Sequence, residues 1–192
     1  APSGYIWENC GRFLEPEEFN NYSLVIWFSG SPTNFNEHQT AVLKEYLTAG
    51  GRVLHTGGGL FARALGRGKL KAESWAGALA WHYNSSTNRP FYPFLQPDHP
   101  YLQGVDTQHQ HIWQRGHYLT KPASEGTVNL LGDEQTSLFS VTRVGEGEMV
   151  WLWEGPFRTR NHELPADGDA FDVVLRNIIT AATPLTAAEE LR

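Results

Sequence analysis

Residues 22–66 read YSLVIWFSGSPTNFNEHQTAVLKEYLTAGGRVLHTGGGLFARALG, and the fold is predicted from this stretch. Leu24–Phe28 and Arg52–His55 are short runs rich in Val, Ile, Leu and Trp, which is typical of buried strands. Gly50-Gly51 is expected to end a helix between them, because glycine adopts the left-handed C-cap conformation at little cost. Strand, helix and strand together predict a βαβ unit and a parallel sheet. The apolar stripe of the helix consists of Val42, Leu43, Tyr46 and Leu47.

Both predicted strands lead into short polar or glycine-rich segments. Ser29-Gly30 follows the first strand, and Thr56-Gly57-Gly58 follows the second. Ligands bind at the carboxyl ends of the strands in open parallel sheets. The glycine run 57–59 is compatible with an anion cradle of backbone N–H groups, and also with close packing of a helix on a strand. The sequence therefore predicts a binding site at this end of the sheet.

The remainder of the chain predicts further elements of a single domain over residues 1–192. Residues 91–108 carry several prolines and are expected to be irregular. Ser137–Val144 and Glu148–Trp153 flank the turn Gly145-Glu146-Gly147 and predict a hairpin. The other expected elements are a helix near Lys71–Leu79, an extended run Ala80–Tyr83, strands within His111–Leu119 and Thr127–Leu131, and a closing helix over Asp169–Ala182.

Composition argues against some classes of partner. The chain has 15 Lys and Arg against 21 Asp and Glu, a net charge of −6, and this disfavours binding to nucleic acid or to anionic membranes. No apolar run approaches the roughly 20 residues of a membrane span. The chain begins at Ala1 without methionine, so we expect that an N-terminal piece was removed or left out. The sequence leaves the compartment open, with a periplasmic or secreted location favoured over the cytoplasm.

Several motifs of the chain resemble a known superfamily. A strand that ends in Ser29-Gly30, a helix that ends in Ala49-Gly50-Gly51 and the following glycine-rich elbow are similar to the class I glutamine amidotransferase-like superfamily. HPYLQG at 99–104 and VTRVGEGEMVWLW at 141–153 resemble segments of its ThuA-like (trehalose utilisation) branch. The resemblance implies an α/β, flavodoxin-like three-layer sandwich, with a mostly parallel sheet and a late β-hairpin. It also implies a carbohydrate-related role.

The chain departs from that superfamily in two ways. An amidotransferase carries its nucleophilic cysteine in a G-x-C-x-G elbow, and the matching position here is Gly57. The family's catalytic base is a late His followed by Glu, and His162-Glu163 lies in that region. The usual first βα unit also has no room before Tyr5. We therefore expect either a fragment of a longer polypeptide or a sheet that is completed in another way.

Candidate site residues cluster at the predicted strand ends. Glu154 follows the hairpin, near Trp153 and Arg158, and a carboxylate, a histidine and an aromatic face suit either recognition of sugar hydroxyls or acid–base chemistry. The catalytic candidates are His55, Glu154 and His162. The substrate-binding candidates are Ser29, Gly30, Thr56, Gly57, Gly58, Trp153 and Arg158.

The sequence predicts neither a metal nor a cofactor. His109, His111 and His117 share the parity of one strand face, but no HExxH pattern or suitably spaced carboxylate accompanies them. Solvated strand faces carry such residues routinely, and this is the interpretation adopted here.

Two functions remain open. The first is a domain that binds or processes a small sugar derivative at the strand ends. The second is a non-catalytic module that kept the fold without the chemistry and has a structural or assembly role, with the remainder of a longer chain or with further copies of itself.

Overall fold

The computed structural model describes residues 14–28, 37–56, 78–83, 91–108, 111–112, 118–122, 126–134, 137–152 and 170–182. The helices in these ranges are α1 (Pro16–Phe19), α2 (Glu37–Thr48), the short 3-10 helix η2 (Pro100–Leu102) and α4 (Ala170–Ala182). The strands are β1 (Val25–Phe28), β2 (Arg52–Thr56), β3 (Ala78–Tyr83), β4 (Phe91–Tyr92), β5 (His111–Ile112), β6 (Tyr118–Pro122), β7 (Thr127–Gly132), β8 (Ser137–Val144) and β9 (Gly147–Leu152).

The main sheet is mixed. Its strands follow the order β1-β2-β9-β8-β6-β3, and β7 pairs with β8 beside this path. β1, β2 and β9 run parallel, whereas the pairings of β8 with β9, β6 and β7 and of β3 with β6 are antiparallel. The parallel part is therefore smaller than the sequence predicted. The predicted late hairpin of β8 and β9 accounts for one antiparallel pairing, and the pairings of β6 and β7 with β8 and of β3 with β6 add the others.

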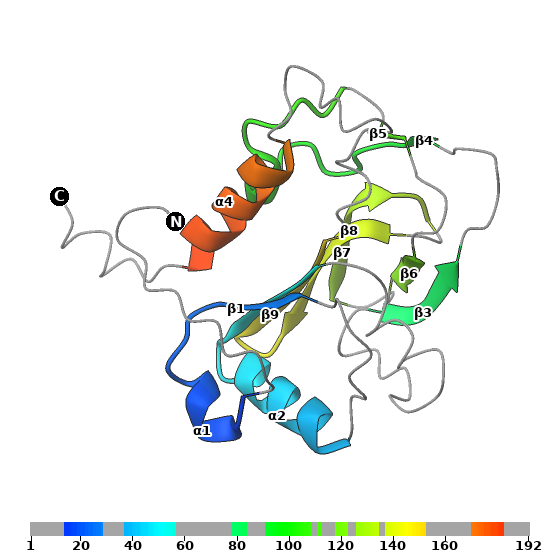
Figure 1. Cartoon of the computed structure of the whole chain (residues 1–192). Helices are drawn as coiled ribbons and strands as arrows, with labels where there is room; N and C mark the ends of the chain where they lie inside the picture. The colour runs from blue at the N-terminus through cyan, green and yellow to red at the C-terminus, as the bar shows by residue number, and fades with distance from the viewer. Residues whose placement is uncertain are drawn as a thin grey trace, which may run out of the picture.

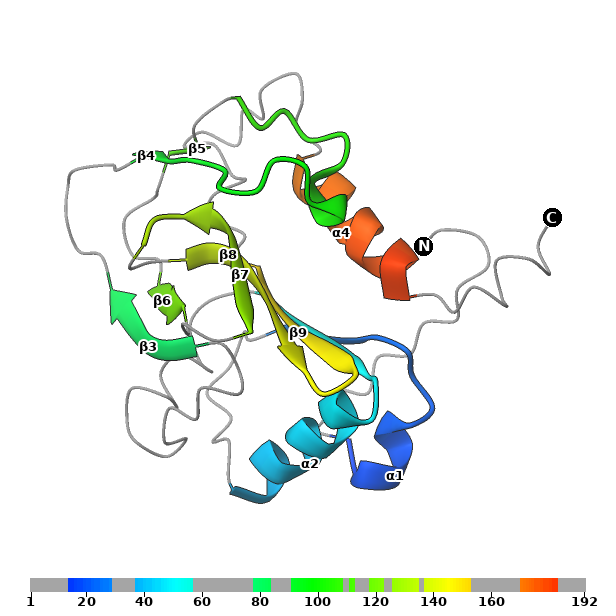
Figure 2. The same cartoon turned by 180° about the vertical axis from the view of Figure 1, so that it is seen from behind.

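Helices cover both faces of this sheet, as Figures 1 and 2 show from opposite sides. On the face of α1 and α2, Val53, Met149 and Trp151 of the sheet pack in one buried cluster with Leu43 and Leu47. On the face of α4 and η2, the buried cluster contains Leu54, Val150, Leu152, Leu102, Val174 and Ile178. Successive residues of β2 and β9 thus alternate between the two clusters, as a strand buried on both faces requires. The predicted three-layer α/β architecture is confirmed.

The predicted βαβ unit is also confirmed. The parallel pairs run from Val25 with Val53 to Phe28 with Thr56, so β1 lies directly beside β2. No further strand lies between β1 and β2, and the two expectations for the missing first βα unit, a fragment of a longer polypeptide or a sheet completed in another way, both remain predictions.

Two glycine-containing turns, Gly50-Gly51 and the turn at Gly147, contact each other where α2 ends. Gly50 has a φ of +104°, the left-handed conformation predicted for the helix end. A Cβ at Gly51 would overlap the ring of Tyr46, and a Cβ at Gly147 would overlap the carbonyl oxygen of Gly51. The N–H of Glu148 donates to that same oxygen at 3.1 Å. The turn between β8 and β9 therefore packs backbone against backbone on the end of α2.

Two predictions of secondary structure differ from the observed elements. The helix predicted over Lys71–Leu79 is wrong at its end, because Ala78 and Leu79 belong to β3, where pairing with β6 overrides helix propensity. The segment 91–108, expected to be irregular, contains β4 and η2. None of the described helices has the length and apolar character needed to cross a membrane.

Candidate functional site

The carboxyl ends of the three parallel strands form one rim. Phe28 is in register with Thr56, and Thr56 with Leu152, so β1, β2 and β9 end side by side. This arrangement was predicted from the βαβ unit and the hairpin. We call this end of the three strands the carboxyl rim.

His55 is a packed residue of the sheet. Its side chain is only 2% exposed, and its ring lies 4.9 Å from the ring of Trp151 on the neighbouring strand. Burial lowers the pKa of His55 to about 3, because the charged imidazolium is poorly solvated there. The imidazole is therefore neutral at physiological pH. Its role as a catalytic base stays a prediction, and its burial disfavours direct contact with a ligand.

Thr56 lies on the opposite face of the sheet from His55. Strand alternation places it on the side of Leu54, which packs toward α4, whereas His55 shares the side of Val53. Thr56 is 2% exposed, and its hydroxyl oxygen has no hydrogen-bond partner among the residues that the structure describes. His55 and Thr56 therefore both lie at the carboxyl rim, but their side chains lie on opposite faces of the sheet.

The other candidate site residues lie outside the described residues. They are Ser29, Gly30, Gly57, Gly58, Trp153, Glu154, Arg158 and His162. Their assignments remain predictions. His109 and His117, for which the sequence predicted no metal, also lie outside the described residues. Among the described residues, no group of three or more His, Cys, Asp or Glu side chains is placed to bind a metal.

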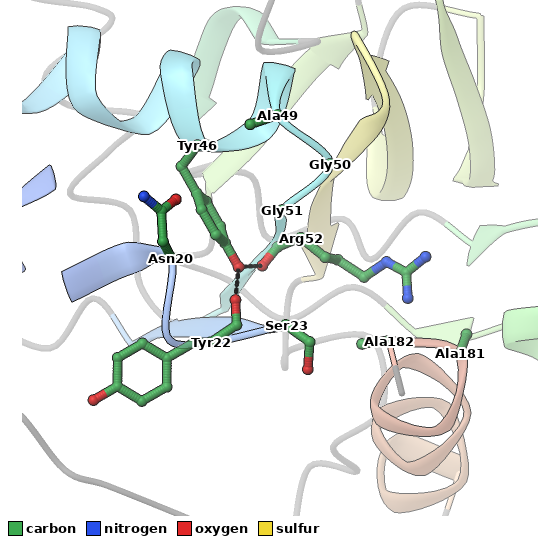
Figure 3. A pocket seen from close by; sticks show the side chains of 10 residues that line it. All are labelled: Asn20, Tyr22, Ser23, Tyr46, Ala49, Gly50, Gly51, Arg52, Ala181 and Ala182. Carbon is green, nitrogen blue, oxygen red and sulfur yellow. Dashed lines mark hydrogen bonds between the residues drawn. The ribbon is translucent and has the colours of Figure 1, made fainter. Parts of the chain in front are cut away.

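A pocket that the sequence did not predict lies at the opposite end of the parallel strands (Figure 3). Its volume is about 390 Å³. It lies beside the amino ends of β1 and β2 and is closed on another side by Ala181 and Ala182, in the last turn of α4. We call it the amino-end pocket. Its remaining lining residues include Asn20, Tyr22, Ser23, Tyr46 and Arg52.

Hydrogen bonds hold the wall of the amino-end pocket. The phenol of Tyr46 donates to the carbonyl oxygen of Tyr22 at 2.8 Å and lies 3.4 Å from that of Arg52 (Figure 3). These contacts tie the end of α2 to the starts of both strands. Burial raises the pKa of Tyr46, so the phenol stays protonated and able to donate.

Arg52 connects the pocket to a polar cluster beneath α4. Its Nε donates to Oε2 of Glu148 at 2.9 Å, and the hydroxyl of Tyr101 donates to the same oxygen at 2.6 Å. Burial, and next the hydrogen bond to Glu148, raise the pKa of Tyr101. Asn177 of α4 donates to the carbonyl oxygens of Tyr101 and Gln103 at 3.1 and 2.9 Å. The sequence signal for this cluster is a pair of opposite charges near the starts of two parallel strands, Arg52 at the first position of β2 and Glu148 at the second position of β9.

Comparisons with known proteins support the fold. No protein-family model matches the chain, and no curated protein matches its sequence. A ThuA-like protein from Bacteroides uniformis is 14% identical, with a TM-score of 0.53 over 87% of this chain and 71% of that one. The cytoplasmic protein STM3548 from Salmonella typhimurium is 16% identical, with a TM-score of 0.54 over 84% and 74%.

A β-galactosidase from Bacillus circulans is similar over part of its length. It is 14% identical, with a TM-score of 0.50 over 84% of this chain, but the chain spans only 23% of that enzyme. At these identities the likeness concerns the fold alone. The chain thus has an α/β, flavodoxin-like fold of the ThuA-like type.

Proposed function

We propose that this ThuA-like domain binds a small sugar derivative at the carboxyl rim. The observation that carries the proposal is the common end of the parallel strands at Phe28, Thr56 and Leu152. Ser29, Gly57 and Trp153 are covalently attached to these three residues. Three segments with candidate binding residues therefore leave the sheet at neighbouring positions, as at ligand sites of other open α/β sheets.

The residue types at these positions suit a sugar. An indole such as that of Trp153 offers an apolar face for a sugar ring, and Arg158 and Ser29 offer hydrogen-bond donors for its hydroxyl oxygens. Glu154 accepts hydrogen bonds from hydroxyl groups when it is ionised. If the domain is also an enzyme, Glu154 and His162 are the acid and base that we propose. The carbohydrate-related role that we propose comes from the resemblance of the sequence motifs to the ThuA-like branch, and the ThuA-like neighbour supports the fold that this role requires.

The test is a thermal-shift and calorimetric screen of neutral monosaccharides and disaccharides against the native chain, two rim variants and one control variant. A sugar that binds the folded state raises the melting temperature by mass action. We expect Trp153→Ala and Arg158→Ala to weaken this binding. Arg176→Ala, at an exposed position of α4, is the matched control and leaves binding intact. Absence of binding by all sugars, or binding that neither rim variant changes, contradicts the proposal.

A structural module is the second candidate function. It is favoured by the packing of His55 against Trp151, which fills one side of the sheet near the rim with buried rings. A module of this kind acts in a longer chain or between copies of itself, so its assay is sedimentation of the purified chain over a range of concentrations. Self-association together with a negative sugar screen supports the module over the sugar-binding domain.

A further inference from the structure

We infer that the amino-end pocket is a second ligand site, for a small neutral molecule that carries several hydroxyl groups. The pocket lies at the amino ends of the strands, opposite to the carboxyl rim, so this inference is independent of the function proposed above. It is drawn from the volume of the pocket, its lining and its balance of charge.

The size and the walls of the pocket suit a single ring-sized molecule. Its 390 Å³ falls within the usual range of small-molecule sites, about 300–1,000 Å³. Small residues form part of its lining, namely Gly50-Gly51 between α2 and β2 and Ala181-Ala182 on α4. The hydrogen bonds of Tyr46 connect the two strand starts that border it, so this wall is pre-formed.

Polar groups line the pocket from separate elements. Asn20 follows α1, Ser23 precedes β1, and Arg52 begins β2. Figure 3 shows the side chain of Arg52 extending from β2 on the side where Ala181 and Ala182 lie. The Nη1 atom of Arg52 is buried and has no hydrogen-bond partner among the described residues. Nη1 therefore does not face the open space of the pocket, and the polar groups that remain for a hydroxyl-bearing ligand are Asn20, Ser23 and the other atoms of Arg52.

The charges at the pocket favour a neutral ligand. Arg52 is already paired with the carboxylate of Glu148, at 2.9 Å between Nε and Oε2. The last turn of α4 adds carbonyl oxygens without intrahelical partners and a partial negative charge. Because Glu148 already pairs with the guanidinium, an anion gains little from Arg52 and is disfavoured by the partial negative charge of the helix end, whereas a cation is disfavoured by the guanidinium itself. A hydroxyl group can donate to the carbonyl oxygens and accept from Arg52 or Asn20 without adding charge.

The experiment compares three probes of the same ring, which are glucose, glucuronate and glucosamine. Each is titrated into the ¹⁵N-labelled full chain, and the backbone amide signals are followed by NMR. We expect glucose to shift the amides of Ser23, Gly50 and Gly51 saturably, with weaker binding of the two charged probes. The variant Ala181→Leu fills the pocket from an exposed helix position and should raise the dissociation constant about tenfold or more. Thr180→Leu, the exposed neighbour, is the control and should leave it unchanged.

Each alternative result overturns the inference in a recognisable way. No saturable shift with any probe removes the site. Shifts confined to Thr56, Leu152 and the residues after them place the sugar at the carboxyl rim, which supports the proposed function and not this pocket. Tighter binding of glucuronate or glucosamine overturns the neutral class. Equal effects of the two leucine variants show that the pocket is not the binding site. Dispersed amide signals of each variant report that it is folded.

Discussion

The buried His55 should make the stability of this protein depend on pH in a specific way. Its pKa is about 3 in the folded chain, against an ordinary value of 6.5. Between these two values the unfolded chain binds a proton at this site and the folded chain does not. Stability from this residue is therefore complete above pH 6.5 and is lost as the pH falls toward 3. Titration of His55 alone should therefore lower the free energy of unfolding by about 2 kcal/mol between about pH 7.5 and about pH 5.

The substitution His55→Phe isolates this contribution. Phenylalanine keeps a ring against Trp151, 4.9 Å away in the native protein, and removes the titrating group. We expect the decrease between the two pH values to be smaller in the variant by about 2 kcal/mol. His99, whose pKa is lowered mainly by burial, contributes equally to both proteins. The comparison uses the change within each protein, so an altered stability of the variant at neutral pH does not affect it.

The assay is urea denaturation at both pH values, followed by circular dichroism. His38→Gln is the control, because it removes a histidine whose side chain is 67% exposed at the surface and is not packed in the core. The reasoning is refuted if His55→Phe retains the native decrease, or if His38→Gln removes as much of it.

Two further predictions concern the packing at the end of α2. Gly147→Ala should lower the free energy of unfolding by about 1–3 kcal/mol, because the new Cβ overlaps the carbonyl oxygen of Gly51. Glu146→Ala, an exposed change in the same turn, should have little effect in urea denaturation, and equal losses would contradict the packing argument. Tyr46→Phe removes the 2.8 Å hydrogen bond to the carbonyl oxygen of Tyr22 and should cost about 0.5–1.5 kcal/mol. An unchanged denaturation midpoint for Tyr46→Phe would show that water replaces this bond.

Local patterns in the sequence predicted those parts of the fold that are local in the chain. The hairpin follows from two strand-like runs around one turn, and β8 has the predicted bounds, Ser137–Val144. The βαβ unit follows from two apolar runs and a helical stripe, and its parallel register is observed. The error at Ala78 and Leu79 has a different origin, because β3 is stabilised by pairing with β6, which is distant in sequence. Residue propensity carries no information about such a partner.

The same distinction applies to the candidate sites. The carboxyl rim could be predicted because consecutive parallel strands must end at one edge of a sheet. Burial of His55 could not, because it depends on Trp151 from the hairpin. Arg52 of β2 and Ala181 of α4 line the same amino-end pocket, and no local pattern in the sequence connects these positions.

The glycine motifs explain why the resemblance is evidence for the fold and not, by itself, for an activity. Gly50 has a left-handed φ at the end of α2, and the backbone of Gly147 lies against the carbonyl of Gly51. These glycines are therefore required for α2 to pack on the hairpin, whatever reaction the domain performs. They also lie at the amino edge of β2, away from the carboxyl rim where the superfamily's elbow occurs. A sequence similarity carried by such residues is evidence of shared packing. Evidence of shared chemistry has to come from the rim residues themselves, which is why the Trp153 and Arg158 variants are the decisive test of the proposed function.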